Sequence, residues 1–243
     1  MERTLRGVVV CLALSGCSST GEWVVQTWGE AYIEQEIPAD VFADGCAVTY
    51  DAFEVSTTAV QLVDGDGTVV GELPSAVYDL TEPGPVPMGR VAVPADHYSD
   101  VQLIVAPDDA GSSVRVDGTL ACGGDQAHFA WAFDPSTTYA CEPTDLTVPP
   151  GGEDTTEITI HGDHLWYDGL EAADAEVRGR AVLDADTDGD GEITLEELDA
   201  VSIPALGYTV GEYSDVLTLR QFVSHLSRTI GHVDGEGECR VAF

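Results

Sequence analysis

The stretch "CAVTYDAFEV", residues 46–55, decides how the first half of this chain folds. Two sets of residues alternate along it: Val48, Tyr50, Ala52 and Glu54 on one side, and Thr49, Asp51, Phe53 and Val55 on the other. The run "AHFAWAFD", residues 127–134, likewise places three aromatic side chains on one face. Such a period of two is typical of β-strands, and Gly, Pro and Asp turns separate these runs. We therefore expect an antiparallel β-sandwich over residues 23–147.

The acidic run "VDGDGT", residues 63–68, predicts a hairpin turn, because Asp-Gly pairs supply the positive φ angles that tight hairpins need. It does not have the spacing of a calcium loop, since Ser75 stands at the twelfth position counted from Asp64.

The chain changes character after "VPPGGEDTT", residues 148–156, which predicts a linker or a sharp turn. A last strand, "TEITI", follows within the segment 148–168. Apolar residues then recur at helical spacing from Leu170 to residue 185, although Gly179 weakens this helix. A second apolar stripe runs from Leu219 to Ile230, after a capping box that begins at Thr218. We expect a mainly β fold with a C-terminal α part, in which a small helical module spans residues 169–243.

The first 16 residues have the pattern of an export signal: two arginines, then an apolar run from Val8 to Leu14 that is too short to span a bilayer. Leu14-Ser15-Gly16-Cys17 resembles the lipobox of bacterial lipoproteins. The resemblance implies cleavage before Cys17, lipidation of its thiol, a tether over residues 17–22 and, from Ser18, location in the outer membrane of the cell envelope. The alternative is a plain secretory signal, which also exports the chain.

Charge and cysteine content limit the partners of the exported chain. Its 44 acidic residues against nine Lys and Arg give a net charge of -35, which repels nucleic acid and attracts cations. An even number of cysteines remains after the signal, which predicts two disulfides in one of three connectivities. We favour Cys46–Cys122, which flanks strand-like runs, and Cys141–Cys239, which ties a domain boundary to the C-terminus. The chain has no CxxC pair, so its spacing of cysteines does not indicate a thiolate metal site.

The run "DTDGDGEITLEE", residues 186–197, matches the spacing D-x-[DN]-x-[DN]-G-x5-E throughout. It resembles the EF-hand family, and the resemblance extends over residues 170–203 with a helix expected on each side of the loop. The implied calcium ligands are Asp186, Asp188, Asp190, the carbonyl of Glu192, Thr194 and the closing carboxylate of Glu197. Sensor EF-hands work in pairs, whereas this chain has one good loop, so we expect calcium to have a structural role.

A second candidate site begins in "TIHGDHLWYD", residues 159–168, where His161 and His164 lie three apart at the end of a strand. Imidazoles at this spacing bind zinc or copper when a third ligand arrives from another segment, and His232 is our first choice for it. The alternative is that both histidines bond backbone groups in a turn.

These observations predict an exported, lipid-anchored calcium-binding protein that acts as a non-enzymatic binding or surface module. The alternative function is a zinc- or copper-binding protein, or a metal-dependent enzyme, that uses His161, His164 and His232. Nucleophilic catalysis is not indicated, because the chain has neither a G-x-S-x-G elbow nor a P-loop. The segment 78–105 resembles prealbumin-like modules of bacterial lipoproteins, and no protein or glycan partner is indicated.

Overall fold

The computed structural model describes residues 20–142, 145–170, 172–235 and 239–242, and its fold is mainly β. One sheet has the strand order β14-β12-β1-β5, and a larger one has the order β13-β9-β8-β2-β7-β10-β15, with β3 and β4 also paired to β2. A third sheet contains β6 and β11. The strands are β1 (Thr20–Trp28), β2 (Cys46–Val63), β3 (Val69–Leu73), β4 (Ala76–Asp79), β5 (Val86–Pro94), β6 (His97–Tyr98), β7 (Asp100–Val105), β8 (Val114–Cys122), β9 (Asp125–Phe133), β10 (Thr137–Cys141), β11 (Leu146–Thr147), β12 (Glu153–Ile160), β13 (Glu192–Ile193), β14 (Gly231–Val233) and β15 (Cys239–Ala242).

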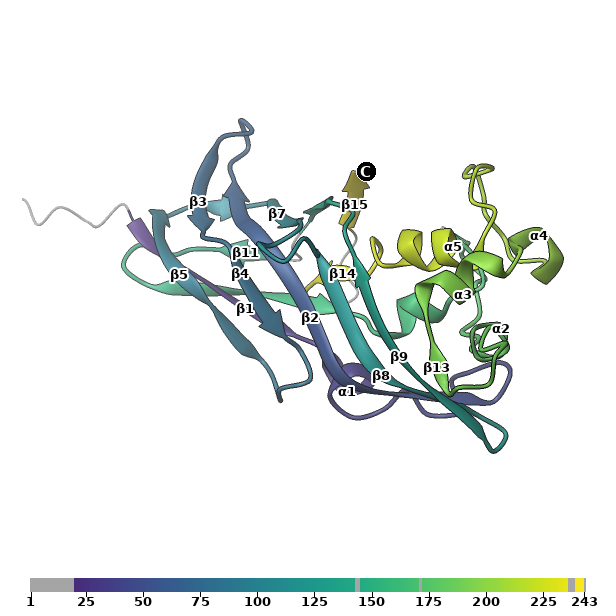
Figure 1. Ribbon diagram of the computed structural model, residues 1–243. Helices are drawn as coiled ribbons and strands as arrows, with labels where there is room; N and C mark the ends of the chain where they lie inside the picture. The colour runs from purple at the N-terminus through teal and green to yellow at the C-terminus, as the bar shows by residue number, and fades with distance from the viewer. Residues whose placement is uncertain (1–19, 143–144, 171, 236–238, 243) are drawn as a thin grey trace, which may run out of the picture.

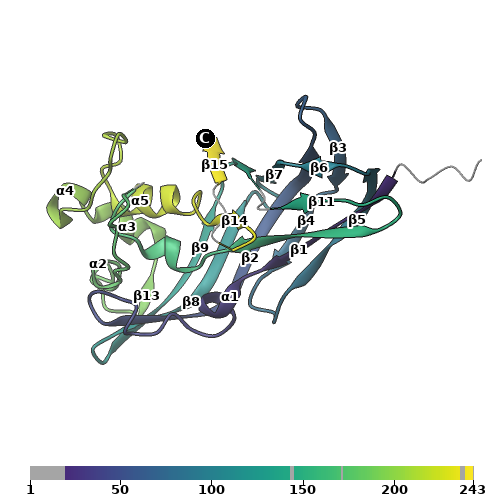
Figure 2. The same ribbon diagram turned by 180° about the vertical axis from the view of Figure 1, so that it is seen from behind.

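The helices are few and short, and the longest in the described residues has eight residues. Most of them gather beside β9 on one side of the molecule, and β3, β4 and β5 lie on the other side (Figures 1 and 2). None of the described helices is long and apolar enough to cross a membrane. The helices are α1 (Glu30–Glu34), the 3-10 helix η1 (Asp163–Trp166), α2 (Arg180–Leu183), α3 (Leu195–Ala200), α4 (Ile203–Leu206) and α5 (Leu219–Leu226).

Strand β2 forms the middle of the larger sheet, and an irregularity in it changes the expected alternation. Its register with β8 shifts between Tyr50 and Ala52. Tyr50 before this bulge and Phe53 after it are both buried, although a regular strand would place them on opposite faces. The extra residue therefore keeps both aromatic side chains in the core.

Both expected disulfides are present, and each joins residues that lie opposite each other on neighbouring strands. Cys46 pairs with Cys122 across β2 and β8, and Cys141 pairs with Cys239 across β10 and β15. The hairpin predicted at residues 63–68 is also confirmed, because it connects β2 to β3. Its backbone turns at Gly67, where φ is 81°.

The expectation of a β-sandwich followed by a small helical EF-hand module is wrong. The helix predicted from Leu170 is reduced to the four residues of α2. The segment before α2 pairs its backbone elsewhere, with bridges from Tyr167 to Val177 and from Gly169 to Thr209. The C-terminal strands join the sheets instead of forming a separate unit, because β14 pairs with β12 and β15 pairs with β10.

Contacts with the first half of the chain explain why α2 starts late. The carboxylate of Asp44 accepts hydrogen bonds from the backbone N–H groups of Gly179 and Arg180, at 2.9 and 2.8 Å. It thereby supplies acceptors for free amides at the start of the helix. A Cβ at Gly179 would also lie 2.9 Å from the Cβ of Cys46, so this position packs directly against a disulfide.

The buried face of α5 belongs to the same continuous cluster of apolar side chains as the two sheets. We therefore predict that Phe222→Ala, which removes a fully buried ring, lowers the free energy of unfolding by about 3–5 kcal/mol in a urea titration. The transition should stay single, because the helix and the sheets share one core. Leu217→Ala, at a side chain that is 56% exposed, is the control and should change stability by at most about 0.5 kcal/mol. A separate transition for the C-terminal segment would contradict a shared core.

Candidate functional site

The turn that carries His161 and His164 follows β12 and continues into η1. The hydroxyl of Tyr50 holds this turn in the core: it donates to the carbonyl of Gly162 at 2.7 Å and accepts from the indole of Trp166 at 2.8 Å. Gly162 is packed tightly, because a Cβ there would lie 2.7 Å from the side chain of Ile33. The two histidines therefore start from a backbone that is fixed on both sides.

Sheet pairing brings His232 to the same place. Strand β14 runs antiparallel to β12, with His232 opposite Thr159, and the backbone N–H of His161 donates to the carbonyl of Ile230 at 2.9 Å. The ring centroid of His161 lies 5.1 Å from that of His164 and 4.7 Å from that of His232. His164 and His232 are 5.2 Å apart. All three histidines singled out in the sequence thus form one cluster.

Two polar atoms in this histidine cluster are buried without a hydrogen-bond partner among the residues that the structure describes. They are Nε2 of His161, a residue only 6% exposed, and Oδ1 of Asp163. The other carboxylate oxygen of Asp163 accepts from the hydroxyl of Tyr167 at 3.2 Å. Since buried polar atoms nearly always have a partner, two exceptions in one cluster need a physical explanation.

His164 is held in the form that binds metals. Its Nδ1 lies 2.7 Å from the carbonyl oxygen of Thr229, and because a carbonyl only accepts, Nδ1 carries the proton and Nε2 keeps its lone pair. Burial lowers the pKa of His164 to about 4, and the nearby imidazoles of His161 and His232 act in the same direction, against Asp163. The imidazole is therefore neutral at pH 7, as a metal ligand must be.

Three of the four residues in question offer ligand atoms that lie close together, and His232 is not in this group. One ligand atom each of His161, Asp163 and His164 lie within 4.8 Å of one another. Two nitrogens on one zinc ion, at about 2.0–2.1 Å from it, are separated by roughly 3.3 Å. His164 and His232 also line a pocket of about 260 Å³ with Leu226 and Val241 in its walls, which gives access from the surface.

The acidic loop, residues 186–197, also brings carboxylates together. Carboxylate oxygens of Asp186, Asp188 and Asp190 lie within 4.8 Å of one another. Two backbone amides donate to Asp186, those of Gly189 at 2.8 Å and Gly191 at 3.1 Å, and both glycines have positive φ, 73° and 84°. The curl of the loop thus uses glycine where other residues would be strained.

The remaining expected ligands of the acidic loop are placed differently. Glu197 is not in the group of three aspartates: its Oε2 accepts from the backbone N–H and the hydroxyl of Thr194, both at 2.9 Å. The bond from the Thr194 N–H and the reciprocal bond from the backbone N–H of Glu197 to the Thr194 hydroxyl oxygen, at 3.2 Å, form the capping box of α3. The side chain of Glu192 points to His128, with Oε2 2.8 Å from Nδ1, and the ligand expected from Glu192 is its backbone carbonyl.

The acidic loop is attached to the edge of the larger sheet. Strand β13 pairs in parallel with β9, with Ile193 opposite Phe129, and the indole of Trp131 donates to the carbonyl of Ile193 at 2.8 Å. His128 on β9 bridges Glu192 and Asp117, and hydrogen bonds to these carboxylates raise the pKa of its imidazole. The periodicity of the sequence predicts the strand β9 but not this pairing.

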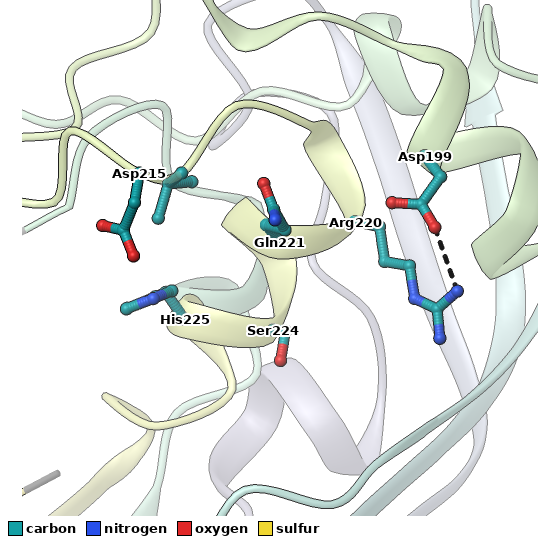
Figure 3. Close-up of a pocket in the computed structure, with 7 residues that line it drawn as sticks. Asp199, Asp215, Arg220, Gln221, Ser224 and His225 are labelled. Atoms are coloured by element: carbon teal, nitrogen blue, oxygen red, sulfur yellow. Dashed lines mark hydrogen bonds and ion pairs between the residues drawn. The ribbon is translucent and has the colours of Figure 1, made fainter.

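A polar pocket of about 400 Å³ lies on the outer face of α5 (Figure 3). An ion pair between Arg220 and Asp199, 3.0 Å long, connects α5 to α3 along one side of it. His225 points into the pocket opposite Asp215 and therefore does not belong to the histidine cluster.

Two residues near the histidine cluster were not singled out in the sequence. Thr229 supplies the carbonyl that orients His164, and the carboxylate of Glu30 lies 3.6 Å from Nδ1 of His161. Neither follows from local spacing. Thr229 comes from the segment after α5, and Glu30 follows β1, which pairs in parallel with β12.

No family model and no curated protein matches this chain. Among solved structures, the chain is similar to MbnP from Methylosinus trichosporium, with a TM-score of 0.38 and 9% sequence identity, over 78% of this chain and 92% of that one. This likeness is too low to support a function, which has to come from the residues of the chain itself.

Tyr50 connects the histidine-bearing turn to the core, and its loss should be costly. We predict that Tyr50→Phe destabilises the fold by about 1–3 kcal/mol for each of the two groups it leaves without a partner, the Gly162 carbonyl and the Trp166 indole. Urea unfolding measures the change. Tyr78→Phe is the control, because the hydroxyl of Tyr78 makes only a 3.5 Å contact to a carbonyl. Equal stability of the two variants would show that the turn does not depend on Tyr50.

Proposed function

We propose that this protein binds a transition-metal ion, zinc or copper, through His161, His164 and His232, with Asp163 as an oxygen ligand. The observation that carries the proposal is the buried Nε2 of His161, which has no hydrogen-bond partner among the described residues, in a ring packed against two further imidazoles. A bound metal ion gives this nitrogen the partner that burial otherwise denies it. This favours the function that the sequence left as the alternative.

The set of donors supports zinc or copper over harder cations. Imidazole nitrogen suits zinc and copper, whereas calcium and magnesium take oxygen ligands. Three nitrogens and one carboxylate match the four ligands of a tetrahedral zinc ion. The net charge of -35 favours the approach of any cation, although it does not choose among them.

Export and anchoring remain part of the proposal and rest on the N-terminal sequence alone. Cys17 and the export signal lie outside the described residues. The two disulfides support an oxidising compartment, where such bonds persist. We therefore propose that the metal is bound outside the cytoplasm, by a chain held to the cell envelope through lipid on Cys17.

The test of the transition-metal site is elemental analysis of protein purified without a histidine tag, followed by zinc and copper titrations. We expect one equivalent of metal in the wild-type protein. Metal binding should weaken by at least about 100-fold in each of the variants His161→Ala, His164→Ala and His232→Ala, which is more than the loss of an outer-shell partner costs. His97→Ala, at an exposed residue of β6, is the control and should bind as wild type does. A wild-type protein that takes up neither metal would refute the proposal.

A second cation site is proposed in the acidic loop, where the three clustered aspartate carboxylates favour calcium. The EF-hand spacing of residues 186–197 supports this, with oxygen ligands from Asp186, Asp188, Asp190, Thr194, Glu197 and the Glu192 carbonyl. Calcium here would be structural: it relieves the repulsion among the carboxylates and strengthens the attachment of β13 to β9.

Calcium should raise the melting temperature. The free energy of unfolding should increase by about 2.7 kcal/mol when the calcium concentration is 100 times the dissociation constant, and magnesium should have a much smaller effect. Asp186→Ala and Glu197→Gln should reduce this shift. Because Gln also serves in a capping box, the second variant removes a charge and leaves the start of α3 capped. Asp66→Ala, in the acidic hairpin turn of residues 63–68, is the matched control. A full calcium shift in both loop variants would exclude this loop as the site.

A further inference from the structure

Glu30 has an unusual backbone conformation next to the histidine cluster. Its φ is 55°, in the left-handed region where a side chain is unfavourable and glycine is the usual residue. Gly29, directly before it, has an ordinary φ of -88°, so the available glycine does not occupy the strained position. Strain of this kind persists where the surroundings enforce it, and it is common at functional sites.

The pairing of two parallel strands places Glu30 beside His161. Strands β1 and β12 run in parallel, with Trp28 opposite Thr159 at their ends. Two residues further along each chain, the carboxylate Oε2 of Glu30 lies 3.6 Å from Nδ1 of His161. This distance is longer than a hydrogen bond, and the interaction is partly shielded from water, because the imidazole is buried while the Glu30 side chain is 29% exposed.

We propose that Glu30 is a positioning residue for the metal site, an inference that rests on the proposed function. Its carboxylate favours the tautomer of His161 with the proton on Nδ1, so that the lone pair is on Nε2. Nε2 is the buried nitrogen of His161 for which the described part of the chain offers no hydrogen-bond partner. Metal-binding histidines generally donate their second N–H to a carboxylate or a carbonyl, which orients the ring and raises its basicity.

In two rings of the cluster an oxygen atom faces Nδ1, within hydrogen-bond distance at His164 and slightly beyond it at His161. The Thr229 carbonyl faces Nδ1 of His164 at 2.7 Å, and the Glu30 carboxylate faces Nδ1 of His161. In both rings Nε2 is thus the nitrogen left for a metal.

Glu30→Gly separates backbone strain from the role of the carboxylate. Glycine adopts a φ of 55° without penalty, so the metal-free variant should melt at the same temperature as wild type or higher. Its dissociation constant for zinc, measured by competition with a chelator, should nevertheless rise by about 10–100-fold. A residue with a purely structural role would leave zinc affinity unchanged.

Glu30→Gln keeps the length of the side chain and the backbone conformation, and it decides the question if the glycine variant folds poorly. The amide oxygen still faces Nδ1 but has no charge, so we expect a smaller loss of zinc affinity than in Glu30→Gly. The absorption spectrum of bound cobalt should change in both variants, because the interaction that orients His161 is lost in Glu30→Gly and weakened in Glu30→Gln. Glu34→Gln is the matched control on the same helix: its Oε1 accepts from the backbone N–H of Gly84 at 2.6 Å, and zinc binding should not change.

The outcomes distinguish the two proposals. If wild type, Glu30→Gly and Glu30→Gln all bind zinc equally well, the role of Glu30 is overturned and the transition-metal site stands. Wild type that binds no zinc, copper or cobalt would overturn both. Loss of affinity in the Glu30 variants but not in Glu34→Gln is the expected result.

Discussion

The hydroxyl of Tyr50 makes the contacts that fix the histidine-bearing turn to the core. It donates to the Gly162 carbonyl and accepts from the Trp166 indole, so the turn between His161 and His164 is bonded to the central strand of the larger sheet. A backbone carbonyl and an indole N–H at this depth cannot reach water, and the hydroxyl satisfies both at once. The bulge in β2 is what allows Tyr50 and Phe53 to enter the same core.

Aromatic packing extends this core from the histidine-bearing turn to the acidic loop. Trp166 lies 5.8 Å from Trp131, measured between ring centroids, and the indole of Trp131 donates to Ile193 in the acidic loop. The loop and the turn are thus supported by the same set of rings, although they are different in chemistry. One offers oxygen atoms at an exposed edge of the sheet, and the other offers nitrogen atoms in a buried cluster.

The attachment of the acidic loop to β9 suits a structural role for calcium. A loop in a sensor pair moves with its partner, whereas here β13 forms a parallel pair with the edge of a disulfide-linked sheet. Order at this edge also protects the unpaired backbone groups that an edge strand presents. An ion in the loop would therefore act mainly on stability.

Local pattern was sufficient for several features, and long-range pairing decided the others. The sequence by itself determined the mainly β character, the hairpin at residues 63–68, the start of α5 at its capping box and the presence of two disulfides, because each leaves a signal in spacing or residue type. It favoured the observed pairing of the cysteines but left three connectivities open, and the structure decided among them. Only the tertiary structure decided that α2 begins at Arg180, where Asp44 accepts from its backbone, rather than at Leu170. It also decided that β14 and β15 join the sheets and that Glu30 faces His161. These depend on segments that are distant in the chain, and their pairing is governed by burial and backbone hydrogen bonding across the whole fold, which periodicity within one segment does not record.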